Sequence, residues 1–294
     1  MVGKVKRCLL VVVAMAVCTG NLMVRAAEYR AADVEEAVKE LYSQDEGVRK
    51  SAAFHLSEMG PEAKNAIPML IELLQSDPSM QVRGESASAL GKIGPAASAA
   101  IPDLISFLKN KEGGYERTYA ASALGNIGLQ PELVLPALID ALQHDEEPVV
   151  RQLSARALGD FGERGRPAIQ PLIQAIESGD KNLREAAAYG LRKIPAGPND
   201  VPALIKLLSD DIDVSREAAA KSLAGAGSEG VAAVPKLITL LDDKNSSVRE
   251  AAAAALGKIG PGAKAAVPAL KRALTDAEIH DQAADALNRI RRKR

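Results

Sequence analysis

One feature constrains the fold more than any other: a short two-part segment recurs along nearly the whole chain. Its best-formed copy, residues 248–274, reads VREAAAAALGKIGPGAKAAVPALKRAL. This copy contains two stretches with the apolar periodicity of helices, joined by a Gly-Pro corner. Because so short a unit cannot bury its own apolar face, the copies must stack and share one continuous core. Such an array offers an extended surface for partners and no enclosed pocket for chemistry.

The copies can be counted from an arginine near the start of each first helix, a position that we call the arginine slot. Alanine follows the slot by four residues and leucine by seven in every copy, which places both on one side of a helix. The slot recurs at intervals of 32 to 34 residues, at Arg49, Arg83, Arg117, Arg151, Arg184, Arg216 and Arg249, with His280 in an eighth copy. The pattern predicts about eight helix pairs and no strand.

Glycine and proline mark the corner within each copy. Glycine ends the first helix because it tolerates the left-handed backbone conformation, and proline suits the first turn of the second helix. The glycines are Gly60, Gly94, Gly128, Gly162, Gly227 and Gly260, and the prolines are Pro68, Pro102, Pro136, Pro202, Pro235 and Pro268. We therefore expect a repeat array over residues 45–294.

The N-terminal segment has the pattern of an export signal over residues 1–26. A basic stretch with Lys4 and Arg7 precedes an apolar run at 8–17, and small residues before Ala27 suit cleavage. The run is too short to span a bilayer, so no membrane span is expected in the mature chain. We expect export to the periplasm or the cell exterior; a retained anchor and lipidation at Cys18 remain alternatives.

Residues 27–44 form the next segment, in which a short helix is expected over 33–42. Val34, Ala37, Val38 and Leu41 lie on one face of that helix. The segment matches the second helix of the repeat without its first helix. We expect it to cap the N-terminal end of the core.

The charges are distributed unevenly along the chain. Residues 27–160 contain 12 basic and 21 acidic residues, a net charge of −9, whereas residues 161–294 contain 21 and 17, a net charge of +4. Aromatic residues make up 3% of the chain, and tryptophan is absent. There is no basic stripe or aromatic platform for nucleic acid. A protein partner of complementary charge and an ordinary solvated surface are both compatible with this distribution.

The pattern VRxxAAxALGxIG followed by AIPxLIxLL resembles the HEAT-repeat superfamily, and in particular the HEAT-like repeats of the phycobilisome lyases. The resemblance covers roughly residues 33–292. It implies an all-α, right-handed α-solenoid whose second helices line a concave, protein-binding surface. The deoxyhypusine hydroxylases in this superfamily hold two irons through His-Glu pairs. Here His55, His144 and His280 are followed by Leu, Asp and Asp, so we expect no metal and no cofactor.

We interpret the arginine slots as structural, since a ligand would not require the same residue in seven copies. Each guanidinium is expected beside the preceding inter-repeat loop. There Asp45, Asp145, Asp180, Asp213 or backbone carbonyls accept its hydrogen bonds.

The second helices provide the candidate partner-binding residues, at positions that vary from copy to copy. These positions are Glu72, Asp103, Ser106, Asp140, Gln174, Lys206, Lys236, Thr239 and Arg272. Variable positions beside a fixed core are typical of a modular binding face, although exposed helix positions vary in any solenoid.

Two copies depart from the pattern. The stretch KNKEGGYE at 109–116 brings Tyr115 and Tyr119 to either side of Arg117, a favoured composition for a binding hot spot. The alternative is that its two glycines loosen a loop that one ring covers. The stretch IPAGP at 194–198 replaces a Gly-Pro corner and predicts a bend or hinge.

No nucleophile triad, phosphate loop or carboxylate pair is evident, so no catalytic residue is assigned. The sequence favours an exported, non-enzymatic scaffold that binds an unidentified protein through the concave face of its second helices. The alternative is a lyase-like or chaperone-like subunit that binds a chromophore or a modified protein in its groove.

Overall fold

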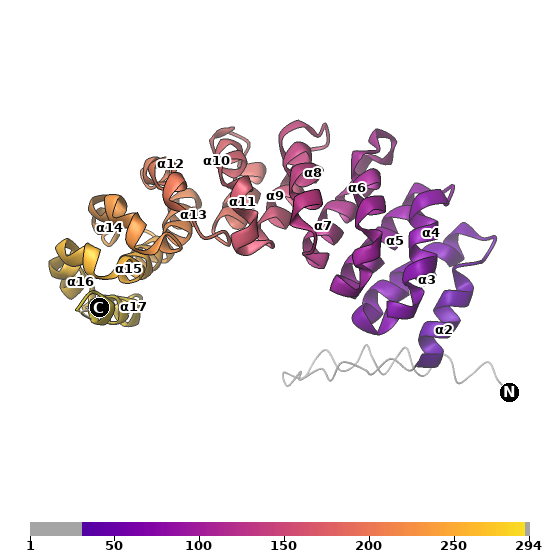
Figure 1. Ribbon diagram of the computed structural model, residues 1–294, viewed down its shortest axis with the longest axis horizontal. Helices are drawn as coiled ribbons and strands as arrows, with labels where there is room; N and C mark the ends of the chain where they lie inside the picture. The colour runs from indigo at the N-terminus through magenta and orange to yellow at the C-terminus, as the bar shows by residue number, and fades with distance from the viewer. Residues whose placement is uncertain (1–30, 292–294) are drawn as a thin grey trace.

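The computed structural model describes residues 31–291. The predicted export signal at 1–26 and the basic residues 292–294 lie outside this range. Between residues 31 and 291 the chain is a series of helices connected by short turns, without a strand. Figure 1 shows the helices stacked in two layers that follow one arch from N- to C-terminus. The all-α solenoid is therefore confirmed.

The first helices of the pairs form one layer and carry the arginine slots. They are α3 (Glu46–Met59), α5 (Met80–Ile93), α7 (Arg117–Ile127), α9 (Pro148–Gly159), α11 (Lys181–Leu191), α13 (Asp213–Ala224), α15 (Ser246–Ile259) and α17 (His280–Arg291).

The second helices form the other layer. They are α4 (Ile67–Ser76), α6 (Ile101–Lys109), α8 (Pro131–His144), α10 (Ile169–Glu177), α12 (Val201–Leu207), α14 (Val234–Leu240) and α16 (Val267–Ala273). Helix α2 (Ala31–Glu40) precedes the first pair and packs on α3. It occupies the place of a second helix at the N-terminal end of the stack.

The corners follow the local chemistry of glycine and proline. Gly94 and Gly260 end their helices with φ angles of 79° and 70°, a conformation that disfavours residues with a Cβ atom. A short 3₁₀ segment follows in most pairs: η2 (Gly60–Ala66), η3 (Gly94–Ala100), η5 (Gly162–Ala168), η7 (Gly227–Ala233) and η8 (Gly260–Ala266). In the third pair, by contrast, α8 begins directly at Pro131 and contains Pro136 in its interior.

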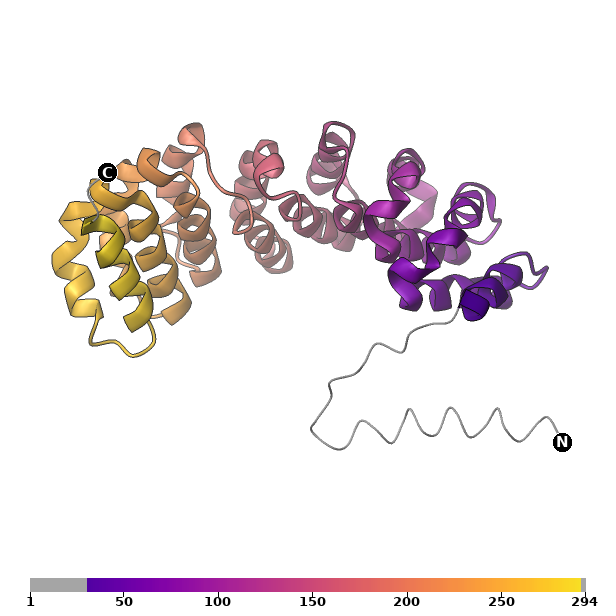
Figure 2. The ribbon, with the colours of Figure 1, turned by 60° about the horizontal axis from the view of Figure 1, so that its bottom comes forward.

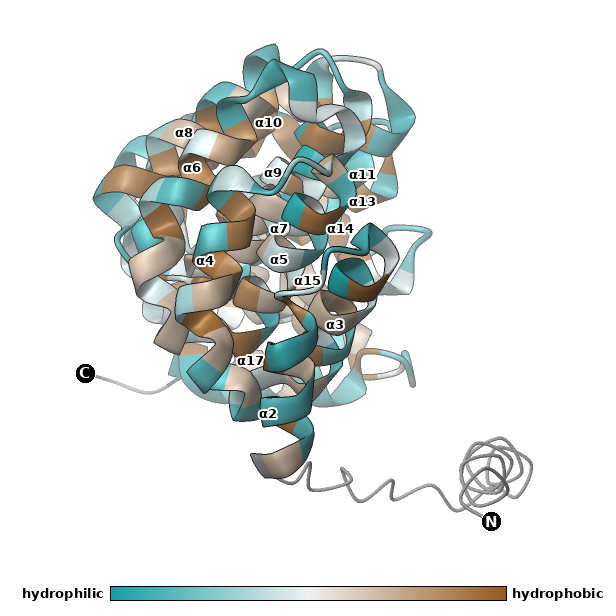
Figure 3. Ribbon diagram, turned by 90° about the vertical axis from the view of Figure 1, so that its right-hand side faces the viewer, coloured by the Kyte–Doolittle hydropathy of each residue, from teal (hydrophilic) through white to brown (hydrophobic). Residues whose placement is uncertain are grey.

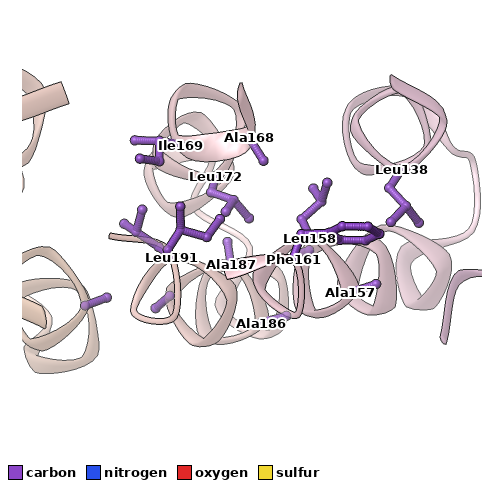
Figure 4. Close-up of a cluster of buried hydrophobic side chains, with 14 of the residues drawn as sticks. Leu138, Ala157, Leu158, Phe161, Ala168, Ile169, Leu172, Ala186, Ala187 and Leu191 are labelled. Atoms are coloured by element: carbon purple, nitrogen blue, oxygen red, sulfur yellow. The ribbon is translucent and has the colours of Figure 1, made fainter. Parts of the chain in front are cut away.

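The core lies between the two layers. Leu158, Phe161 and Leu191 project from the first-helix layer toward Leu138 and Leu172 in the second-helix layer (Figure 4). All five side chains are buried. The leucine seven residues after each slot is buried in all eight copies, as its spacing predicts.

Small residues bring neighbouring first helices into backbone contact. A Cβ atom on Gly91 would lie 2.6 Å from the Cα atom of Ala123, and one on Gly125 would lie 2.9 Å from the Cα atom of Ala157. These glycines stand eight residues after their slots, and each alanine stands six residues after the next slot. The first-helix layer is therefore the more tightly spaced one.

This spacing decides the direction of the curvature and corrects the predicted position of the second helices. The tightly spaced first helices lie on the inside of the arch, and the second helices lie on the outside (Figure 1). The view from the N-terminal side agrees, with α5, α7 and α9 inside and α4, α6, α8 and α10 around them (Figure 3). The concave surface is thus lined by first helices, and the expectation that second helices line it is wrong.

Candidate functional site

The arginine slots are occupied by structural side chains, although their carboxylate partners differ from those predicted. Arg49 donates from Nε and Nη2 to Asp77 at 2.7 and 3.1 Å, and Arg216 donates in the same way to Asp243 at 2.8 and 2.9 Å. Arg249 also pairs with an aspartate of the following loop, Asp276. Each carboxylate comes from the next inter-repeat loop, 27 or 28 residues later. The preceding loop was predicted to supply it.

The predicted carbonyl acceptors are present, in the preceding loop or the last turn of the preceding second helix. Arg151 donates to the carbonyl of Asp145 at 2.7 Å, and Arg83 and Arg184 donate to the carbonyls of Leu74 and Ile176. Asp45 and Asp180, two of the predicted partners, accept backbone N–H groups at the starts of α3 and α11. These carboxylates therefore cap helices and do not accept from the slots.

The ion pair of Arg216 and Asp243 is nearly excluded from water. The hydrogen bond to Asp243 is the largest influence on the pKa of Arg216, and it raises that pKa. Burial is the largest single influence on the pKa of Asp243, and it raises that pKa. The hydrogen bonds from Arg216 and from the N–H of Asn245, together with the charges of Arg216 and Lys244, outweigh burial, so the pKa of Asp243 lies below its usual range.

Arg117 belongs to this structural set and does not form a hot spot with the two tyrosines. Its residue is 5% exposed, and its guanidinium pairs with Asp145 and donates to the carbonyl of Gly114. A Cβ atom on Gly113 would lie 2.9 Å from its Cγ atom. The Gly-Gly pair therefore makes room for this arginine, which corrects the assignment of Arg117 to partner binding.

Tyr115 and Tyr119 contact each other, and Arg117 takes no part in this contact. Their rings pack edge to face with centroids 6.3 Å apart. Tyr115 is 56% exposed, whereas Tyr119 is half-buried beside Gly84 of α5. Burial is the main cause of the raised pKa of Tyr119, and Glu85 adds to it. Tyr119 belongs to the first helix α7, and Tyr115 lies in the 3₁₀ segment Lys111–Glu116 directly before it.

The candidate residues of the second helices lie on the outside of the arch. Asp103 is half-buried, and the other eight, Glu72, Ser106, Asp140, Gln174, Lys206, Lys236, Thr239 and Arg272, are exposed. Several form contacts between neighbouring pairs, such as Gln75 to Asp103 at 2.9 Å and Lys206 to Glu177 at 2.9 Å. They form a polar outer surface.

Open grooves separate some second helices because this layer is the more widely spaced one. One groove of about 410 Å³ lies between α6 and α8, with Asp140 and His144 in its wall. Another of about 440 Å³ lies between α8 and α10 and includes Gln174. Both are open to solvent and have linings that mix polar and apolar surface, unlike the enclosed sites that hold small ligands.

The exposed side chains of the first helices form the concave face. On α5, Gln81 and Lys92 are exposed and Glu85 and Ser88 are half-buried; positions equivalent to Glu85 and Ser88 hold Tyr119, Phe54 and Tyr189 on other helices. The sequence interpretation missed Phe54, which is 49% exposed, and Tyr189. Both stand five residues after an arginine slot, a position whose exposure becomes evident only when the direction of curvature is known.

Three cations surround Tyr189 on this face. The Cζ atoms of Arg156 and Arg192 lie 5.4 and 4.5 Å from the ring centroid, and the Nζ atom of Lys193 lies 4.3 Å from it. The nearby ammonium of Lys193 is the main cause of the lowered pKa of Tyr189. The ring thus anchors a local basic cluster.

Residues 31–291 contain neither a cluster of metal ligands nor a helix that could span a membrane. This range contains no group of three histidine, cysteine or acidic residues placed to hold a metal ion. None of its helices combines the length and the apolar character needed to cross a bilayer.

Comparison with known families decides the identity of the array. HEAT repeats match residues 34–128, 135–224 and 201–288. The chain belongs to the HEAT-repeat family. Residues 116–144 also match the phycobilisome-lyase HEAT-like repeat, so the resemblance found in the sequence is confirmed.

Solved structures with a similar fold include an engineered protein with a TM-score of 0.63 and 26% sequence identity. That match covers 90% of this HEAT-repeat chain and 82% of the engineered one. The complex of CpcE and CpcF of phycocyanin lyase from Nostoc sp. PCC7120 matches with a TM-score of 0.48 and 22% identity. It covers 87% of this chain and 94% of that chain. A search of curated proteins found no match.

Proposed function

We propose that this HEAT-repeat protein is a non-enzymatic scaffold that binds a protein partner on its concave face. The observation that carries this proposal is a set of aromatic side chains on or beside the first helices: Phe54 and Tyr115 are exposed, and Tyr119 and Tyr189 are half-buried. Exposed aromatic side chains cost free energy in water and dominate the energetics of protein interfaces. Four of the eight aromatic residues of the chain are used in this way.

The outer surface is a weaker candidate for the main interface. Leu133 of α8 is the large apolar side chain that the described second helices expose most, at 50%. The remaining variable positions there are polar and solvated, and exposed polar pairs add little binding free energy. We therefore place the interface on the concave face, and not on the second helices where the sequence suggested it.

Export is part of the proposal and is supported by the pattern of residues 1–26. Expression of the full chain in a bacterium, followed by mass spectrometry of the periplasmic and secreted fractions, tests it. We expect a product that begins at Ala27. A protein that keeps residues 1–26 and stays in the cytoplasm would contradict export and leave the scaffold function untouched.

A double variant tests the interface. Phe54→Ala with Tyr119→Ala removes two concave aromatic rings, and Leu133→Ala with Gln174→Ala is the matched change on the outer face. We expect proteins captured by the wild type to be lost with the first variant and kept with the second. The reverse pattern would place the interface on the second helices.

The same preparation tests the chromophore-binding alternative. The scaffold proposal predicts a purified protein without absorbance in the visible range. A copurifying visible chromophore would favour a lyase-like subunit instead.

A further inference from the structure

The junction between α11 and α13 differs from the other contacts between first helices. At the other six contacts between first helices, glycine, alanine or serine stands eight residues after the slot of the earlier helix, but here the residue is Arg192. The chain then crosses toward α12 in an extended connection (Figure 2). A Cβ atom on Gly225 would lie 2.3 Å from the Cβ atom of Pro195, so this connection lies between the two helices. Arg192 consequently projects from the concave face. At the equivalent position of units such as the one with Gly91, the neighbouring first helices approach to backbone contact.

Arg192 joins a basic cluster that spans two units. Arg156 comes from α9, Tyr189 from α11, and Arg192 and Lys193 directly follow α11. We call these four residues the Tyr189 patch. All three cations lie within 5.4 Å of one ring, so an anionic group placed over the patch would meet all of them at once.

The carboxylates nearby do not balance this charge. Lys193 pairs with Asp160 at 2.7 Å, while Glu217 is shared between Arg192 at 3.7 Å and Lys221 at 2.6 Å. Within residues 31–291, no carboxylate lies within ion-pair distance of Arg156, whose exposed guanidinium rests on the Tyr189 ring. Together the four cations and two carboxylates of this region have a net charge of +2.

We propose that the Tyr189 patch binds a short acidic segment of a protein partner. The inference rests on the proposed scaffold function and names the chemistry of its partner. Arginine forks bind carboxylates through two parallel hydrogen bonds, and Tyr189 holds both guanidinium groups in place by stacking.

The charge around the patch selects a short anion over a long one. Residues 27–160 have a net charge of −9, and Glu185 and Glu250 are exposed on the first helices α11 and α15. A nucleic acid that extended from the patch toward the N-terminal half would meet this acidic surface and be repelled. A segment with a few aspartate or glutamate residues places its charge on the patch alone.

Fluorescence anisotropy with a labelled Glu/Asp-rich peptide tests the proposal, with a neutral peptide of equal length as the reference. We expect the acidic peptide to bind, and Arg156→Ala with Arg192→Ala to weaken it about tenfold or more, because two charge-assisted hydrogen-bonding groups are lost. Lys236→Ala with Arg272→Ala removes the same charge from the outer face and should leave binding unchanged. Circular dichroism checks that each variant is folded.

One further variant separates a binding role from a structural one. Glu217→Gln removes a carboxylate that competes for Arg192 and should strengthen peptide binding. Equal weakening by both double variants, or no preference for the acidic peptide, would overturn the proposal. So would tighter binding of a single-stranded oligonucleotide to the same patch.

Failure of the acidic-segment proposal can be distinguished from failure of the proposed scaffold function. If the peptide does not bind while Phe54→Ala with Tyr119→Ala still abolishes partner capture, the scaffold stands and the acidic partner chemistry is wrong. If that aromatic variant keeps partner capture and the acidic peptide does not bind, the concave interface itself is wrong.

Discussion

Asp243 shows how one residue can hold two repeats together. It accepts both hydrogen bonds of the Arg216 fork across 27 residues of sequence, in a site where both side chains are less than 10% exposed. It also accepts the backbone N–H of Asn245 at 2.9 Å, at the start of the next first helix. The carboxylate therefore ties α13 to the loop before α15.

Asp243→Asn should lower the free energy of unfolding by about 2 kcal/mol, because the neutral amide accepts only part of this charged hydrogen bonding. Urea denaturation of the variant measures the change. Asp242→Asn is the control: its side chain is 76% exposed, 4.0 Å from Arg272, and its replacement should cost less than about 0.5 kcal/mol. Equal effects of the two substitutions would contradict the structural role of the pair.

The lowered pKa of Asp243 also predicts a pH dependence. A carboxylate with a folded-state pKa below its unfolded value of about 3.9 stabilises the fold fully above that value. The stabilisation is lost as the pH falls toward the folded-state pKa. The gap in melting temperature between wild type and Asp243→Asn should therefore narrow below about pH 4. A gap that stays constant would show that Asp243 is not the group that titrates.

At the scale of elements, the approach of neighbouring first helices depends on glycine. The Gly91 backbone touches Ala123 of the next first helix, and a methyl group there would meet both its Cα and Cβ atoms within 2.8 Å. Proline, glycine and apolar spacing predicted where each helix begins and ends, because those signals act within one unit. The sequence interpretation assigned the small alanines to close packing but overlooked this glycine.

Gly91→Ala should destabilise the protein by about 1–3 kcal/mol through overpacking, although alanine is the better helix former by about 1 kcal/mol. Ser122→Ala, on the concave side of α7, is the control and should be neutral or slightly stabilising. Chemical denaturation measures the change in the free energy of unfolding for both variants. A stabilising effect of Gly91→Ala would mean that the helices can move apart without cost.

At the scale of the whole molecule, the junction between α11 and α13 divides the array. Its contact is made through Ser222, which donates from Oγ to the carbonyl of Ile194 at 2.7 Å, and through Ala196, whose N–H donates to the carbonyl of Ser222 at 2.9 Å. The segment IPAGP thus lies where helix contact is less extensive than at other junctions and loop contacts add to it.

Ser222→Ala removes the buried hydroxyl and should cost about 1–2 kcal/mol. Hydrogen exchange should accelerate in residues 192–225 and change little from α3 to α7, because each repeat contacts only its neighbours. Thr239→Ala, an exposed hydroxyl that donates to its own helix, provides the control. Uniform acceleration along the chain would show that the junction is not a local boundary.

The sequence by itself determined the repeat register, the helix pairs, the glycine corners and the structural character of the arginine slots. Each of these follows from periodicity and backbone preferences that act within one unit. The tertiary structure alone decided which layer lies inside the arch and which aspartate faces each arginine. It also showed that Arg156, Arg192 and Lys193 meet around Tyr189. These features depend on how closely neighbouring units approach, and that distance is set by side-chain volume at contacts between units that are far apart in the sequence.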